Sequence, residues 1–155
     1  MLTSRYPPAA LVSAIVAIAG LLAVGIGGFL PWVRSGLVVR SSFEIAGIAE
    51  RLGSRAYPIL DVMFACWVAI PLVCVICVGL FTLGLLRSAA ASAIIVSLLA
   101  GTVALATYVL GSGGSGAVAV VGTGPLTTCI GAAVALVGSV GALLGRRGGR
   151  PSGIA

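Results

Sequence analysis

Two cysteines in the segment Cys74-Val75-Ile76-Cys77 have the C-x-x-C spacing of thiol–disulfide oxidoreductases. A redox motif of this kind needs an accessible, activated thiolate, whereas these two residues lie inside a wholly apolar run. Membrane thiol oxidoreductases also use four-helix bundles, but they relay electrons through further cysteines in an exposed loop. The other two cysteines, Cys66 and Cys129, also lie in apolar runs. We therefore interpret Cys74 and Cys77 as small packing residues, with a membrane thiol enzyme as the alternative.

The chain has no histidine, which removes the usual ligand of zinc and haem sites and any Ser-His-Asp or Cys-His arrangement. We predict no catalytic residue, no metal site and no cofactor. Asp61 is the one carboxylate inside a predicted span, and an intramembrane charge is by default a functional candidate. It lies near the end of its span, where burial costs less. We expect it to form an ion pair with Arg34 or Arg55.

Composition places the chain in a membrane. Of its 155 residues, 60% are apolar and 8% are charged, and the mean hydropathy is +1.26. Soluble domains carry about 25% charged residues, so this surface must face lipid. The net charge of +6 does not predict nucleic-acid binding, because the arginines form no basic stripe interleaved with aromatic residues. The chain is long enough for one domain.

Four apolar runs predict an all-α, four-span membrane bundle. A helix needs about 20 residues to cross the hydrocarbon core. The predicted spans are residues 9–30, 59–83, 89–110 and 125–145. The first is longer than the apolar region of a signal peptide, about 7–15 residues, and no A-x-A site follows it, so we expect an uncleaved span.

Features inside the spans predict how they pack. Pro71 should kink the second span, and a short connection around Arg87 should join the second and third spans as a helical hairpin. Small residues four apart allow close helix contact. Such contact is open between packing inside the chain and packing against another subunit. The pairs are Ser97 with Gly101, Ala100 with Ala104, and Gly141 with Gly145.

The loop of residues 31–58 is the one long stretch not suited to lipid. Ser41-Ser42-Phe43-Glu44 has the form of a capping box, in which Ser41 and Glu44 satisfy each other's backbone amide. Apolar residues then follow at helical spacing and predict an amphipathic helix over residues 42–52. Its apolar face can pack on the bundle, on lipid or on a partner. The candidate partner contacts are Trp32, Phe43, Ile45, Ile48, Leu52, Gly141 and Gly145.

A small external sheet is also predicted. Residues 36–40, GLVVR, form a β-prone run too short to be stable alone. The available mate is residues 117–121, AVAVV, between the third and fourth spans, although this run is equally able to begin the fourth helix. We therefore expect two strands that join the two loops.

Arginine positions predict the orientation. Four spans place both termini on one side, and the double arginine Arg146-Arg147 directly follows the last span. Cytoplasmic flanks carry the excess of basic residues. We expect cytoplasmic termini and an external 31–58 loop in a bacterial plasma membrane. The preference for Ala, Gly and Arg over Lys favours a GC-rich genome.

The run PWVRSG (31–36), followed by RSSFE (40–44) and a short helical segment, resembles a group of small four-span membrane proteins of actinobacteria. The likeness is best over residues 28–67. In architecture the chain is also similar to claudin-type tetraspans, although the loop cysteine pair of claudins is missing and no disulfide is implied. The resemblance implies an envelope that contains large machines, including respiratory supercomplexes and Mce-type lipid importers, and it supplies no catalytic residues.

These observations favour a non-enzymatic accessory or stabilising subunit of a larger membrane complex, with an Mce-type lipid transporter as the leading candidate. Its partners would be other membrane subunits and the lipid bilayer. One alternative is a small homo-oligomeric transporter or channel, and another is an accessory subunit of a respiratory supercomplex. Transport would need a polar path, for which the scattered candidates are Asp61, Thr102, Thr107 and Thr127.

Overall fold

The four apolar runs form four long helices. The computed structural model describes residues 8–35, 38–44, 47, 58–111 and 118–145. Each helix contains a segment long and apolar enough to cross a membrane, which confirms the four-span all-α bundle. The helices are α1 (Pro8–Phe29), α3 (Pro58–Thr82), α4 (Leu86–Gly111) and α5 (Thr123–Gly145).

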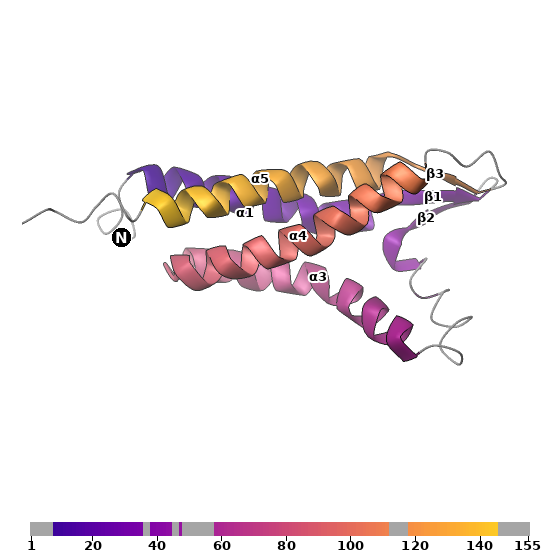
Figure 1. Cartoon of the computed structure of the whole chain (residues 1–155), viewed down its shortest axis with the longest axis horizontal. Helices are drawn as coiled ribbons and strands as arrows, with labels where there is room; N and C mark the ends of the chain where they lie inside the picture. Colours follow the sequence, from indigo (N-terminus) through magenta and orange to yellow (C-terminus); the bar gives the residue numbers. More distant parts are fainter. Residues whose placement is uncertain (1–7, 36–37, 45–46, 48–57, 112–117, 146–155) are drawn as a thin grey trace, which may run out of the picture.

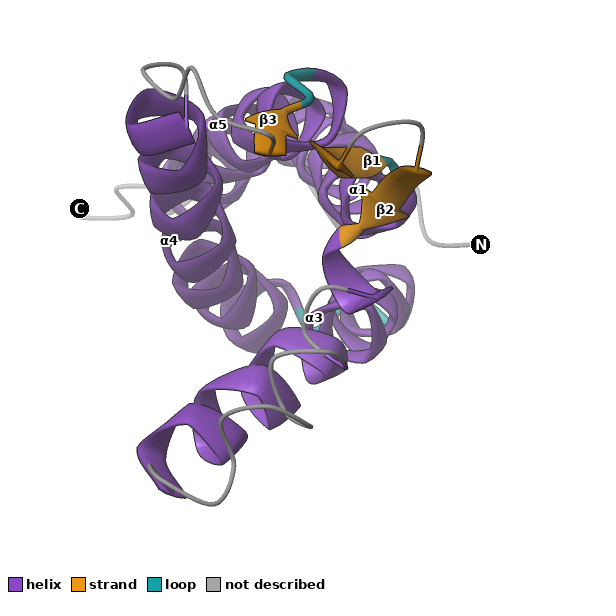
Figure 2. Cartoon of the chain, turned by 90° about the vertical axis from the view of Figure 1, so that its right-hand side faces the viewer, coloured by secondary structure: helices purple, strands orange, loops and turns teal. Residues whose placement is uncertain are grey.

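The helices form two layers (Figure 1). One layer is the antiparallel pair α1 and α5, and the other is formed by α3 and α4. Helix α4 begins beside α3 and ends beside α5, as the end-on view in Figure 2 also shows. The first part of α3 diverges from the other helices (Figure 1). Pro71 lies inside α3, where it removes a backbone hydrogen bond and kinks the helix.

The contact between α1 and α5 is a seam of very small residues. A Cβ atom added at Gly20 would collide with the backbone of Ala135, and one added at Gly138 would collide with the backbone of Ala17. A Cβ atom added at Gly131 would likewise come within 2.8 Å of the backbone nitrogen of Val24. Without Cβ atoms the two backbones touch directly, and this contact replaces the large apolar core of a soluble bundle because lipid offers no hydrophobic drive between helices.

Buried residues on α5 recur at alternating steps of four and three. These are Gly124, Thr128, Gly131, Ala135, Gly138 and Ala142. That spacing is a 3.5-residue repeat, which keeps one face of a helix against its neighbour along the whole contact. The seam therefore runs from one end of the bundle to the other.

A tight turn joins α3 to α4. Gly84 has a φ of 77°, its amide donates to the carbonyl of Phe81, and the amide of Leu85 donates to the carbonyl of Leu80. These two bonds make a Schellman motif, in which glycine supplies the left-handed conformation. The turn confirms the helical hairpin and fixes α4 against the end of α3.

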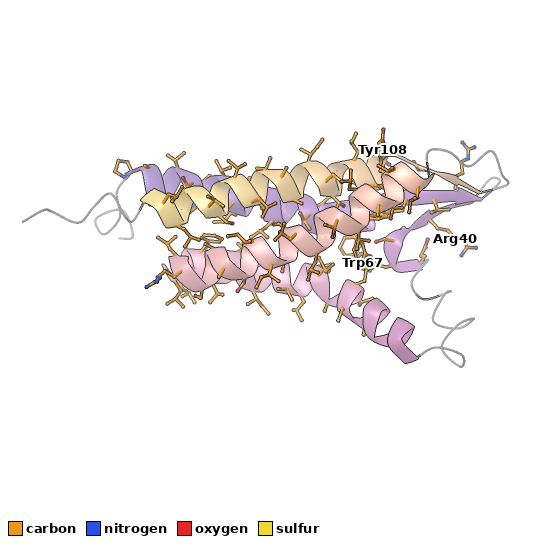
Figure 3. All side chains as sticks on the ribbon, in the orientation of Figure 1. Arg40, Trp67 and Tyr108 are labelled. Carbon is orange, nitrogen blue, oxygen red and sulfur yellow. The ribbon has the colours of Figure 1, made fainter. Side chains whose placement is uncertain are left out.

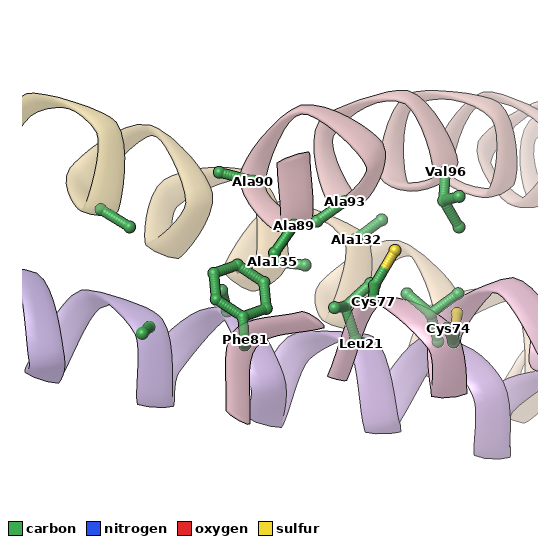
Figure 4. Close-up of a cluster of buried hydrophobic side chains, with 14 of the residues drawn as sticks. Leu21, Cys74, Cys77, Phe81, Ala89, Ala90, Ala93, Val96, Ala132 and Ala135 are labelled. Atoms are coloured by element: carbon green, nitrogen blue, oxygen red, sulfur yellow. The ribbon is translucent and has the colours of Figure 1, made fainter. Parts of the chain in front are cut away.

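The interior between the two layers is filled mainly by alanine and a few larger side chains. Figure 4 shows Phe81, Leu21 and Cys77 in this space, close to alanines of α4 and α5. Leu21 and Val24 are the largest fully buried side chains among the described residues. Because the interior is closely packed, even one added methyl group is expected to change the stability of the fold.

A three-stranded antiparallel sheet covers one end of the bundle (Figures 1 and 2). Its strands are β1 (Pro31–Ser35), β2 (Val38–Ser41) and β3 (Val118–Val120), in the order β2-β1-β3. The predicted sheet between the two loops is therefore confirmed, but its two expected strands do not pair directly. Strand β1 lies between them, because the chain after α1 continues in an extended conformation and turns back at once as a hairpin.

Candidate functional site

Trp32 fastens the sheet to the helices. The pairing of β1 with β2 shifts between Pro31 and Val33, so Trp32 occupies a bulge, a feature that re-aims a side chain. Its side chain is 4% exposed, and its indole nitrogen donates to the carbonyl of Gly27 at 2.9 Å. Its own carbonyl accepts from the amide of Val121 at 2.9 Å. Trp32 was a candidate partner contact, but its burial makes it an internal anchor.

The indole of Trp32 also needs room and a neighbour. A Cβ atom added at Gly124, near the start of α5, would collide with the ring. On its other side the ring lies edge-on to Trp67 of α3, with centroids 5.3 Å apart and an angle of 82°. This T-shaped geometry is favourable for aromatic pairs. One side chain thus connects α1, the sheet, α3 and α5.

The predicted capping box is present. The amide of Ser41 donates to Oε2 of Glu44 at 3.1 Å, and the amide of Glu44 points to Oγ of Ser41 at 3.4 Å. Residues 42–44, here called the cap turn, are helical, as is Gly47. The rest of the predicted helix 42–52, including Ile45, Ile48 and Leu52, lies outside the described residues.

The cap turn faces the bundle. Ser42 is buried and its hydroxyl donates to the carbonyl of Gly28 at 2.7 Å. The ring of Phe43 lies over Gly28 and against the ring of Phe29, with centroids 4.8 Å apart. Of the three surfaces on which this segment could pack (the bundle, lipid or a partner), Phe43 therefore packs on the bundle.

We expect replacement of Ser41 by alanine to loosen the cap turn by about 1 kcal/mol, the usual value of an N-cap side chain. Hydrogen–deuterium exchange at residues 42–44 should accelerate about fivefold. The matched control is Ser92→Ala, since the Ser92 hydroxyl only donates to the carbonyl of Ser88 within its own helix. Unchanged exchange in the Ser41 variant would contradict a structural role for the box.

A hollow lies beneath the cap turn and between the two layers. Its enclosed volume is about 10 Å³, which is room for about one water-sized molecule. Trp67 and Pro71 of α3 form one wall, and Phe43 lies at the end near the sheet. The remaining lining residues are Val24, Gly25, Gly28, Ile70, Ala100 and Thr128. The lining is apolar apart from Thr128, whose hydroxyl already donates to the carbonyl of Gly124 at 3.0 Å.

Two arginines of the sheet lie on opposite faces. Arg40 is paired with Val33, and Arg34 is paired with Val39. Directly paired residues share a face and successive residues alternate, so Arg34 and Arg40 are on different sides. Figure 3 shows Arg40 on the side of the sheet that faces α3 and Trp67. The predicted ion pair is not tested, because Arg55 and the side chain of Asp61 lie outside the described part of the chain.

The cysteines do not form an accessible redox site. Cys74 is 3% exposed and Cys77 is fully buried, both in the core between the layers (Figure 4). Cys129 is half-buried and its thiol points to the carbonyl of Gly101 at 3.8 Å. All four cysteines, including the exposed Cys66, are free thiols. Within the described residues, no cluster of three or more metal-ligating side chains exists.

The threonines proposed for a polar path are satisfied locally. The hydroxyls of Thr102, Thr107 and Thr127 each donate to a carbonyl one turn earlier in their own helix. Two other hydroxyls, those of Ser97 and Ser139, are fully buried and have no hydrogen-bond partner.

No protein-family model matches the chain, and the comparisons with curated proteins and with solved structures find no match.

The small-residue pairs are used inside the chain. A Cβ atom at Gly141 would meet the hydroxyl of Ser13 at 2.7 Å, and one at Gly145 would lie 3.4 Å from the backbone of Ala10. Both glycines, proposed as partner contacts, thus lie against α1. A Cβ atom added at Gly101 would lie 3.1 Å from Cβ of Ala132 of α5.

Sequence reasoning missed three residues of this end of the bundle. Trp67 and Gly28 line the hollow, and Arg40 lies on the adjacent face of the sheet. The signal for Trp67 was available, because it is one of the two tryptophans of the chain and lies within the predicted span of residues 59–83. The signal for Gly28 was hidden among several glycines at the end of α1.

Proposed function

We propose that the protein is a non-enzymatic accessory subunit that stabilises a larger bacterial membrane complex. The observation that carries this proposal is that the other helices cover little of the surface of α3. Of its apolar segment, Ala65–Thr82, 17% is buried, against 28–39% for the corresponding segments of the other three helices. A helix that packs so little against its own bundle has most of its surface available to another subunit.

The outward face of α3 supports docking by a transmembrane helix. Val68, Leu72 and Val75 form a stripe at helical spacing and are 56%, 63% and 65% exposed. Gly79 continues the stripe, and a Cβ atom there would meet nothing within 4 Å. Since Gly79 is not required by contacts within the chain, its role is close approach of a partner backbone. The glycines of the α1–α5 seam, in contrast, already pack against the facing helix of the same chain.

The proposed setting is a plasma membrane with cytoplasmic termini and the sheet outside. The arginines after α5 support this orientation. The resemblance of the loop to small actinobacterial proteins favours an Mce-type lipid transporter as the complex, with a respiratory supercomplex as the alternative. A homo-oligomeric transporter would use the same α3 stripe against a second copy.

The proposal is tested by placing a photo-crosslinking amino acid at Val68 in native membranes. We expect one discrete heavier adduct that contains a different membrane subunit and that also co-purifies stoichiometrically in mild detergent. The matched control is the same amino acid at Val137 of α5, which is 71% exposed and should give only lipid adducts.

Mass spectrometry of the adduct separates the hypotheses. A subunit of a lipid importer supports the leading assignment, and a respiratory subunit supports the alternative complex. An adduct between two copies of this chain would overturn the accessory role in favour of the homo-oligomer. Absence of any protein adduct at Val68 would overturn both.

A further inference from the structure

The first part of α3 stands apart from the bundle. Residues 58–70 of this helix, here called the arm, diverge from the other helices (Figure 1). Cys66 and Val68 of the arm are exposed. The side of the arm that turns to the bundle carries Trp67 and Ile70, which line the hollow. Much of the described surface of the arm is therefore free to face lipid.

Pro71 weakens the helix at the base of the arm. Proline has no amide hydrogen, so the carbonyl of Trp67, four residues earlier, has no helical donor. The proline ring also crowds that carbonyl. The helix can therefore bend at this point without breaking a further backbone hydrogen bond.

One aromatic contact ties the base of the arm to the sheet. The ring of Trp67 lies edge-on to that of Trp32, with centroids 5.3 Å apart, and Trp32 is itself fixed by its hydrogen bond to Gly27. The free energy of such a pair corresponds to a roughly two- to tenfold change in a population ratio. Separation of the pair exposes Trp67 to lipid, which costs little because the bilayer is itself apolar. The arm is therefore held in place by a small free energy.

We propose that the arm is a lever that swings about Pro71 between two positions. In the latched position, which the structure shows, Trp67 contacts Trp32; in the released position the arm has moved away from the sheet. Because Trp32 also fastens the sheet to the helices, a change at the external sheet is transmitted to the arm within the membrane, and the reverse. This inference does not rest on the proposed docking of a partner to α3.

The test measures distances between two spin labels on the full-length protein in lipid nanodiscs, by pulsed electron paramagnetic resonance. One label is at Ile59→Cys, the second residue of α3, and the other is at Leu126→Cys, near the start of α5. Cys66 and Cys129 are replaced by serine. We expect two distances, the shorter from the latched position. The control pair, Val75→Cys with Leu126→Cys, has its α3 label on the other side of Pro71 and should give one distance.

Substitutions at the latch and at the hinge separate the two parts of the lever. Trp67→Leu removes the edge contact and should lower the ratio of latched to released protein roughly two- to tenfold. Trp67→Phe keeps an aromatic ring and should retain most of the wild-type ratio. Pro71→Ala restores the donor to the carbonyl of Trp67, straightens α3 and should give one narrow distance distribution. Val68→Ala changes an exposed side chain of the arm and should behave as the wild type.

Thermal unfolding of each variant checks that the fold is intact. The same distance distribution in Trp67→Leu and in the wild type would overturn the latch. Two distances that persist in Pro71→Ala would overturn the hinge. A single distance in the wild type that neither substitution changes would overturn the lever as a whole.

Discussion

Replacement of Gly138 by leucine is expected to open the bundle. A Cβ atom at this position collides with the backbone nitrogen and Cα of Ala17 and comes within 2.8 Å of the carbonyl of Ser13. A backbone cannot rotate away as a flexible side chain can, so α1 and α5 must separate along the seam. Overpacking usually costs about 1–3 kcal/mol and occasionally more, and we expect this variant at or above the upper limit. Thermal or denaturant unfolding in detergent micelles measures the loss.

The controls are glycines with open space around them. Alanine at Gly25 or Gly79 adds a Cβ atom that meets nothing, and alanine is up to about 1 kcal/mol better than glycine within a helix. These two variants should therefore be as stable as the wild type or slightly more stable. A Gly138→Leu protein with wild-type stability would show that α1 and α5 are not in backbone contact.

Replacement of Trp32 by alanine is expected to detach the sheet from the helices. The variant loses the hydrogen bond to Gly27, the edge contact with Trp67 and the filling of the space at Gly124. Truncation of a buried aromatic costs about 3–5 kcal/mol, so unfolding in detergent should shift by that amount. Faster hydrogen exchange should appear at β1, β3 and the start of α5.

Trp32→Phe separates the two contributions of this side chain. Phenylalanine keeps much of the ring packing but leaves the carbonyl of Gly27 without its indole donor, a loss of about 1 kcal/mol. Tyr108→Ala is the control for removal of an exposed aromatic, since Tyr108 is 42% exposed, and it should change stability by less than about 0.5 kcal/mol. Equal stability of Trp32→Ala and Tyr108→Ala would contradict the anchoring role.

Local signals of the sequence predicted the elements well. Apolar runs located all four helices, because length and hydropathy largely decide whether a helix can span lipid. The capping box at Ser41 and Glu44 was predicted residue by residue, since both its bonds join residues three apart. The helical hairpin could be predicted without identifying Gly84, because so short a connection permits few turn conformations.

Tertiary contacts could not be predicted from these local signals. Strand β1 begins with Pro31 and contains a bulge at Trp32, so it has neither the composition nor the alternation of an ordinary strand. Its position between β2 and β3 depends on contacts far apart in the chain. Glycines are abundant, and only the three-dimensional register distinguishes Gly138, which touches a backbone, from Gly25 and Gly79, which touch nothing.

The candidate site, too, was predicted only in part. The kink at Pro71 followed from the chemistry of proline, but the direction in which α3 leaves the bundle did not, and that direction creates the hollow lined by Trp67. In the sequence, Arg40 was only the last residue of the β-prone run 36–40. Its pairing with Val33 showed on which face of the sheet Arg40 lies.

The seam between α1 and α5 also governs the order in which the chain can assemble. It joins the first and the last of the four spans, so its contacts have the largest sequence separation in the molecule, and contacts of this kind form late. During synthesis the α3–α4 hairpin can close locally as soon as it leaves the ribosome, while α1 waits in the membrane with its glycines and alanines uncovered. Arrival of α5 then closes the bundle and positions the last strand of the sheet in one step.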